Sequence, residues 1–329
     1  MKRVTLSMVL VAGLISSSAM AADMATKAPP APAAPPPSPW DVAITAALMT
    51  DYNFRGITQS AHRPSTQAGF ELRYNFNSSW QAYAGSSGES IDFPNGTAAE
   101  IDFYGGIRPT FDKLALDFGI WYYYYPGGQC FNTLALCNAF GGTGGNTALA
   151  LSNGNTIVGN ESFYEAYAKA TYTINDNWSV AGQFYYSPNV IGSGADGEYY
   201  TGNITYTEPS TWYPANSGLG GYVSGDIGYW ALGTTNAFYA TAAFPNGIPY
   251  KSYTNWDAGI GFTYKAFTLD LRYYDSNLSK GDCNAYTGDQ TATGTNNVTA
   301  INPSGLGSNW CSAAYIAKLS FATNLSGLK

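Results

Sequence analysis

The stretch Phe267-Thr268-Leu269-Asp270-Leu271-Arg272-Tyr273-Tyr274-Asp275 decides the fold. Its odd-numbered positions are apolar as far as Tyr273, and its even-numbered positions are mostly polar. Successive side chains of a β-strand point to opposite faces of the sheet, so this alternation predicts a strand with one apolar and one polar face. The stretch from Gln67 to Phe76 repeats the pattern. One face of each strand suits lipid, and the other suits water.

The same period of two extends along most of the chain. It predicts strands near residues 41–58, 65–76, 80–89, 99–110, 114–125, 161–173, 178–188, 198–207, 219–230, 253–264, 267–276 and 310–322. Bacterial single-chain barrels have an even number of strands, as this set does. The predicted fold class is therefore all-β, a transmembrane antiparallel β-barrel of about 12 strands.

The connections between these strands alternate in length. Short links fall at 77–79, 111–113, 175–177 and 265–266, with a longer exception at 208–218. The long links at 126–160, 231–252 and 277–309 are rich in Gly, Asn, Thr and Ser. Outer-membrane barrels have short periplasmic turns and long extracellular loops, whereas a soluble β-sandwich does not predict this order.

Composition supports a membrane barrel and excludes other classes. Charged residues are only 11% of the chain, aromatic residues reach 16%, and the formal net charge is −7. This acidic balance excludes nucleic acid as a partner. The mean hydropathy of −0.16 suits strands in which every second residue faces water. Trp80 and Trp178 open strands after tight turns and are expected to belong to an interfacial aromatic girdle.

The two ends of the chain predict export and assembly. Residues 1–21 have the basic start, apolar core and Ala19-Met20-Ala21 site of a secretory signal peptide. Residues 22–39 form a Pro/Ala-rich periplasmic linker, 40–322 the barrel and 323–329 a C-terminal tail. The last strand, with Tyr315 to Phe321, looks like the signal read by the barrel-assembly machinery. The expected location is the outer membrane of a Gram-negative bacterium, with its lipids and lipopolysaccharide as partners and a homo-oligomer as a further expectation.

A distinctive motif lies between residues 50 and 60. It reads Thr50-Asp51-Tyr52-Asn53-Phe54-Arg55-Gly56-Ile57-Thr58-Gln59-Ser60 and is followed by Pro64. It resembles the opening Asp-Tyr-x-Phe-Arg-Gly-x-x-Gln-Ser of the TorF porin family, and a looser likeness extends over most of residues 41–322. The resemblance implies an outer-membrane, porin-like barrel without implying a particular permeant.

The alternation also predicts which charged side chains line the lumen, because such groups are costly on a lipid-facing wall. Eight acidic and six basic residues are expected to point inward: Asp51, Arg55, Glu71, Arg73, Asp102, Arg108, Asp117, Glu165, Lys169, Asp226, Asp257, Asp270, Arg272 and Lys318. Asp51 with Arg55 is the first candidate for a functional pair, and a strand-to-strand salt bridge at the rim is the alternative. The predicted function is a narrow passive diffusion channel with a slight cation preference. A barrel of this size can also be plugged by its own side chains.

The four cysteines predict two disulfides in long loops, Cys130 with Cys137 and Cys283 with Cys311, although three pairings are open. A zinc site would need clustered ligands, and the only histidine, His62, lies in another loop. No metal or cofactor is expected.

Two functions other than a channel are considered on the basis of the residues. A lipid-modifying enzyme would need a His beside a Ser; His62 has Ser60 and Ser65 nearby but no obvious orienting carboxylate, so the protein is predicted not to be an enzyme. Adhesion or recognition by the long loops is the second alternative, because loops usually carry recognition.

Overall fold

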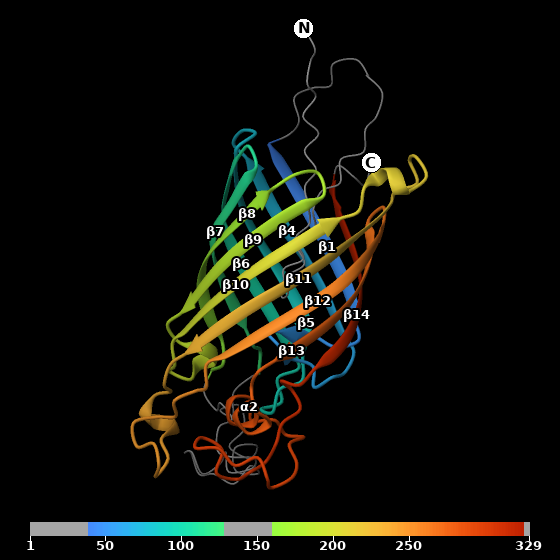
Figure 1. The fold of residues 1–329 in the computed structure, drawn as a ribbon. Helices are drawn as coiled ribbons and strands as arrows, with labels where there is room; N and C mark the ends of the chain where they lie inside the picture. The colour runs from blue at the N-terminus through green and yellow to red at the C-terminus, as the bar shows by residue number, and fades with distance from the viewer. Residues whose placement is uncertain (1–38, 128–159, 326–329) are drawn as a thin grey trace.

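A computed structural model of the chain describes residues 39–127 and 160–325 (Figure 1). The predicted signal peptide, nearly all of the linker, the Cys130–Cys137 pair and the last four residues of the tail lie outside the described residues. Among the described residues, no helix is long and apolar enough to cross a membrane.

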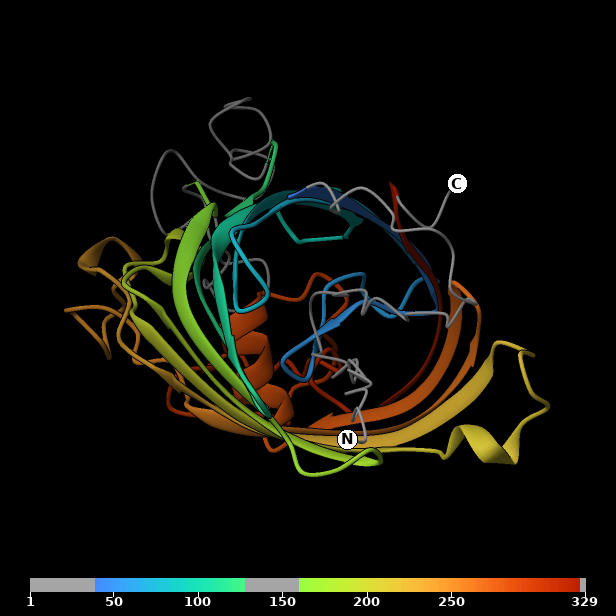
Figure 2. The same ribbon diagram turned by 90° about the horizontal axis from the view of Figure 1, so that it is seen from above.

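The described residues form a closed antiparallel barrel of twelve strands (Figures 1 and 2). The strands are β1 (Trp40–Met49), β4 (Ser65–Asn75), β5 (Trp80–Ser90), β6 (Ala99–Phe111), β7 (Leu114–Tyr124), β8 (Phe163–Thr173), β9 (Trp178–Ser187), β10 (Gly197–Thr207), β11 (Leu219–Leu232), β12 (Tyr253–Tyr264), β13 (Phe267–Ser276) and β14 (Ala314–Asn324). Each strand from β4 onward pairs with the next, and β1 pairs with both β4 and β14. The predicted fold class and strand number are confirmed.

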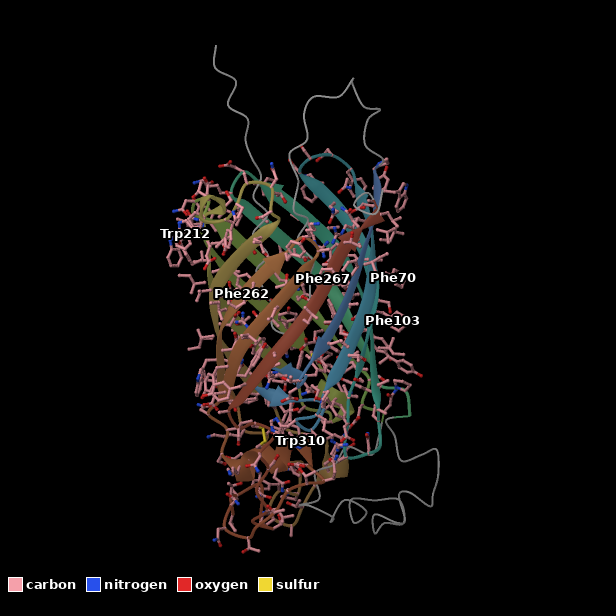
Figure 3. All side chains as sticks on the ribbon, turned by 90° about the vertical axis from the view of Figure 1, so that its right-hand side faces the viewer. Phe70, Phe103, Trp212, Phe262, Phe267 and Trp310 are labelled. Atoms are coloured by element: carbon pink, nitrogen blue, oxygen red, sulfur yellow. A yellow bond between two sulfur atoms is a disulfide. The ribbon has the colours of Figure 1, made fainter. Side chains whose placement is uncertain are left out.

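The two faces of the wall differ as the alternation predicts. Phe70 and Phe103 are 56% and 50% exposed on the outer face, as Figure 3 shows, whereas the adjacent Glu71 and Asp102 are 3% and 2% exposed. Phe262 and Phe267 also lie on the outer face. The outer wall is therefore apolar and the inner wall polar, which is the arrangement of a membrane-spanning barrel.

The two ends of the barrel differ in their connections. We call one the turn end, where residues 76–79, 112–113, 174–177 and 265–266 join the strands; the longer link 208–218 there contains the 3-10 helix η4 (Ser210–Trp212). At the other, the loop end, lie residues 50–64, 91–98, 188–196, 233–252 and 277–313. These loops include η3 (Val190–Gly192), η5 (Ala237–Tyr239) and the helix α2 (Lys280–Thr287).

The predicted strand at 41–58 is too long. β1 ends at Met49, and the chain then leaves the wall to form β2 (Asn53–Phe54) and β3 (Ile57–Thr58) within the outline of the barrel (Figure 2). The two residues between them, Arg55 and Gly56, have φ angles of 51° and 80°. Two consecutive positive φ angles are those of the type I′ turn, which favours a tight hairpin. We call residues 50–64 the inner hairpin.

The predicted last strand also begins too early, because residues 310–313 form a turn and β14 begins at Ala314. Cys311 in this turn is bonded to Cys283 of α2, with 5.9 Å between their Cα atoms, which confirms the predicted pairing. Tyr286 of α2 packs edge-on against Trp230 of β11. The loop end is thus closed over by an aromatic core, while the rest of the inner wall is polar.

Candidate functional site

The first charged group on the inner wall lies toward the turn end of β4, β6 and β7. Arg108 donates two hydrogen bonds to Glu71, from Nη1 to Oε1 (2.7 Å) and from Nη2 to Oε2 (2.9 Å). Its Nε donates to Asp117 Oδ2 at 3.1 Å, and Arg73 Nε donates to Glu71 Oε1 at 2.6 Å. Bidentate charge-assisted bonds of this kind fix both partners. We call these four residues the Arg108 cluster.

The second group lies on β11, β12 and β13. Asp226 and Asp257 stand directly opposite each other in the strand register, where two like charges repel. Arg272 offsets this repulsion with its positive charge. Its Nη1 donates to Asp257 Oδ1 (2.5 Å) and lies 3.9 Å from Asp226 Oδ2. Its Nε donates to Asp270 Oδ1 (3.0 Å). All four side chains are buried. We call them the Arg272 cluster.

The inner hairpin carries its own cation to the opposite wall. Arg55, at the tip, donates from Nη1 and Nη2 to the two carboxylate oxygens of Glu165 on β8, at 2.8 and 2.6 Å. The guanidinium carbon also lies 4.2 Å from the ring centre of Tyr199 and 4.4 Å from that of Trp230. Tyr123 donates a further hydrogen bond to Glu165 at 3.1 Å. The tip is therefore held by an ion pair inside an aromatic cage.

The predicted pair of Asp51 with Arg55 is wrong. Because β1 ends before Asp51, the two residues do not share a strand face, and the turn directs Arg55 toward Glu165. Asp51 instead accepts hydrogen bonds from the hydroxyl groups of Thr58 and Ser60 and from His62. The predicted rim salt bridge between the two residues is wrong for the same reason.

His62 ties the inner hairpin to the loop between β13 and β14. Its Nδ1 lies 2.8 Å from Asp51 Oδ2 and its Nε2 lies 3.0 Å from the backbone oxygen of Asn309. Both partners are acceptors, so both ring nitrogens donate and the imidazolium form is favoured. The hydrogen bond to Asp51 raises the pKa of His62 above its ordinary value. Asp51 is an orienting carboxylate that is not obvious from the sequence, but in this arrangement neither nitrogen of His62 is free to act as a base.

The remaining predicted residues also lie on the inner face, apart from these groups. Lys169 sits over the ring of Tyr167 at 4.5 Å, and Lys318 donates to Gln67 Oε1 at 3.0 Å. Asp102 lies beside two inward carboxylates that the sequence analysis missed, Glu89 and Glu100. Glu100 is two residues before Asp102 on β6 and therefore faces the same side, so the alternation also predicts that Glu100 points inward.

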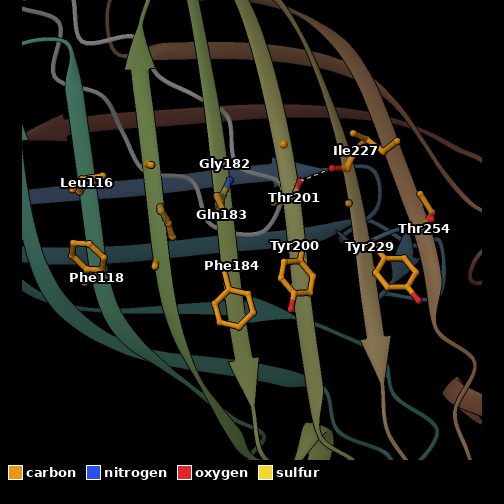
Figure 4. Close-up of a pocket in the computed structure, with 15 residues that line it drawn as sticks. Leu116, Phe118, Gly182, Gln183, Phe184, Tyr200, Thr201, Ile227, Tyr229 and Thr254 are labelled. Atoms are coloured by element: carbon orange, nitrogen blue, oxygen red, sulfur yellow. Dashed lines mark hydrogen bonds between the residues drawn. The ribbon is translucent and has the colours of Figure 1, made fainter.

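Two hollows lie away from the charged groups. Figure 4 shows a shallow groove of about 720 Å³ on the outer wall, where Phe184, Tyr200 and Tyr229 stand beside small residues such as Gly182. Its apolar lining faces the lipid side, so it is not part of the lumen. A cavity of about 60 Å³ separates the inner hairpin from the other loops and is bordered by Glu161. Burial raises the pKa of Glu161 to about 8.

One family model matches part of the chain. Residues 33–143, which include the motif at 50–60, match a family described as "Bacterial protein of unknown function (Gcw_chp)". The match covers roughly a third of the chain, and the TorF name predicted from the motif stays a prediction. No protein of curated function matches in sequence.

Several solved structures are similar in fold. The KdgM porin is 8% identical with a TM-score of 0.40, and the alignment covers 85% of this chain and 98% of that one. The NanC porin is 9% identical with a TM-score of 0.37 and the same coverage. LpxR from Salmonella typhimurium is 9% identical with a TM-score of 0.41, covering 85% and 99%. The fold assignment itself rests on the strand pairing described above.

Proposed function

We propose that the protein is an outer-membrane, porin-like channel for passive diffusion of ions or small hydrophilic solutes, with its loop end outside and narrowed by the inner hairpin. The observation that carries the proposal is the charged inner wall toward the turn end. There the side chains of Arg108 and Asp117 keep 17% and 14% of their surface accessible, inside a wall whose outer face is apolar. Water-accessible charges in a lumen suit hydrated solutes.

The inner hairpin sets the expected restriction. Its tip is fastened by Arg55 to Glu165, and the aromatic side chains around it fill the loop end of the lumen. Because side chains rather than a continuous strand ladder hold the tip, the hairpin is the part of the lumen best placed to yield. We therefore expect a small conductance that grows when the tip is released.

Charge should give a weak cation preference. Glu89 and Glu100 add two carboxylates to the acidic excess already present among the predicted inward residues. An excess of acidic groups along a pore favours cations. The reversal potential in asymmetric salt measures this preference directly. A reversal potential whose sign indicates preferential passage of anions would contradict it.

Single-channel recording tests the proposal. The wild-type protein in planar bilayers should show discrete, small conductance steps at high salt. Arg55→Ala should increase their size or open time, because Glu165 loses its partner and the tip is released. Arg63→Ala is the matched control, since Arg63 lies in the same segment but pairs with Asp92 in an exposed position. Silence of the wild type and Arg55→Ala alike would contradict a channel.

A closed barrel that acts through its loops is the second candidate. The observation that favours it is the loop end, where α2, its disulfide and the aromatic core form a packed cap. Loops on a rigid scaffold often carry recognition. Folded but electrically silent protein, in both the wild type and Arg55→Ala, would favour adhesion or recognition. Lipopolysaccharide, the barrel-assembly machinery and a second copy of the chain remain the partners that we expect.

A further inference from the structure

Three carboxylates meet on the inner wall near the loop end, apart from the Arg108 and Arg272 clusters. Glu89 on β5 stands directly opposite Glu100 on β6, and Asp102 follows two residues later on the same face. One ligand oxygen from each lies within 4.8 Å of the other two. All three residues are buried, with exposed fractions of 2–3%. Like charges opposed on a sheet destabilise it, and burial increases that cost.

Only some of the oxygen atoms of these three carboxylates accept hydrogen bonds. Glu100 is satisfied, because Tyr52 donates to Oε1 at 2.7 Å and Tyr125 donates to Oε2 at 2.6 Å. Glu89 Oε2 and Asp102 Oδ1, by contrast, are buried without a hydrogen-bond partner. A buried carboxylate oxygen with no donor is costly, so a bound cation would stabilise these two atoms.

No basic side chain of the described residues forms an ion pair with these carboxylates. In the described parts of the chain, no Lys or Arg nitrogen lies within 4.0 Å of these carboxylates, whereas the other two clusters each centre on an arginine. Lys318 attracts Glu89 only over a distance greater than 4.0 Å, because its ammonium group donates a hydrogen bond to Gln67 instead. Among the described residues, these three carboxylates therefore lack the arginine that balances each of the other two clusters.

We propose that Glu89, Glu100 and Asp102 bind a divalent cation, with Ca²⁺ as the preferred ion. Ca²⁺ accepts carboxylate oxygens at about 2.3–2.6 Å, so two oxygens on opposite sides of one ion lie roughly 5 Å apart. The 4.8 Å grouping of the three oxygens fits this spacing. Ca²⁺ suits the site better than Mg²⁺, which retains its waters and demands octahedral geometry. Because Tyr52 belongs to the inner hairpin, the bound ion would also stiffen the wall on which the hairpin rests.

Calorimetric titration of the full chain tests the site. The protein is refolded into detergent micelles without lipopolysaccharide, stripped with EDTA and titrated with Ca²⁺. We expect one ion per chain and a higher thermal unfolding midpoint in its presence. Glu89→Gln and Asp102→Asn should each weaken Ca²⁺ binding at least tenfold. Glu161→Gln, a buried carboxylate outside the group, should leave the affinity unchanged. Absence of saturable binding to the wild type, or equal binding by the Glu89→Gln/Asp102→Asn double variant, would overturn the proposal.

Terbium luminescence gives a second measurement on protein with the carboxylates intact. The indole N–H of Trp121 is directed toward the Asp102 carboxylate, so Trp121 is placed to sensitise Tb³⁺ bound there. Excitation of the indole should give Tb³⁺ emission that Ca²⁺ displaces, and Trp121→Phe should lower the emission while keeping the Ca²⁺ affinity. If the wild type gives no such emission and is equally stable in EDTA and Ca²⁺, the carboxylates hold protons instead and the proposal is wrong.

Discussion

The inner hairpin and the barrel wall carry the same kinds of side chain but are held in different ways. Each wall strand is fixed by hydrogen bonds to two neighbouring strands. The hairpin has only two paired positions of its own, Asn53 with Thr58 and Phe54 with Ile57. It is attached to the barrel by single side chains, chiefly Arg55 and His62, and by isolated backbone hydrogen bonds, from Thr58 N to Trp310 O and from Asp92 N to Gln59 O. Loss of an ion pair should therefore weaken the whole barrel when both partners lie on the wall, and release only a segment when one partner lies on the hairpin.

The largest effect is expected from a wall arginine. Arg272→Met leaves Asp226, Asp257 and Asp270 buried without their shared cation. Removing one partner of a buried ion pair costs about 3–5 kcal/mol. The free energy of unfolding, measured by urea titration in lipid vesicles, should fall by about that amount.

Arg63→Met provides the comparison, because the pair of Arg63 with Asp92 is exposed. Such pairs contribute about 0–1 kcal/mol. Equal effects of the two substitutions would show that the Arg272 cluster is solvated like the surface, and the distinction between buried wall charges and exposed charges would fail.

A smaller, local effect is expected at the hairpin tip. Glu165→Gln leaves the buried Arg55 without its counter-charge, which should cost about 3 kcal/mol and raise the fraction of open hairpin by roughly 100-fold. Chymotrypsin cleavage after the buried Phe54 in the folded protein reports this opening, because the bond becomes accessible when the segment detaches. Global unfolding in urea should change much less than in Arg272→Met.

The double variant Arg55→Met/Glu165→Gln removes both charges of this pair. It should be cleaved more slowly than Glu165→Gln alone, since no buried charge is left unpaired. Additive effects of the two substitutions on the cleavage rate would mean that the Arg55–Glu165 contact does not hold the hairpin.

The sequence predicted the wall closely because its cause is local. Lipid on one side and water on the other impose a period of two on each strand, and the strand expected at 267–276 has those bounds in β13. The strand end at Met49 was missed because Tyr52 and Phe54 continue the alternation beyond it. The available signal was Gly56, whose φ of 80° suits glycine in a tight turn.

The sequence does not predict which side chains pair with each other across the lumen. Glu165 lies 110 residues from Arg55, so no spacing rule connects them, whereas the pairing of Asp51 with Arg55 follows from the inward alternation of both residues within the motif at 50–60. His62 and Asp51 pair only because the hairpin folds back on itself. The group of Glu89, Glu100 and Asp102 depends instead on strand register, which alternation alone does not give.

The smallest expected effect concerns pH and the same hairpin. Because Asp51 raises the pKa of His62, the charged imidazolium stabilises the closed hairpin. This contribution is complete below the ordinary pKa of about 6.5 and is lost as pH rises through the higher folded-state pKa. His62 is 36% exposed, so the effect should stay below about 1 kcal/mol. Hydrogen exchange of residues 50–64, corrected for intrinsic rates, should show more frequent opening at pH 8.5 than at pH 5.5. His62→Gln should remove that difference while leaving exchange in β13 unchanged, and an equal pH response of the variant would exclude His62 as its source.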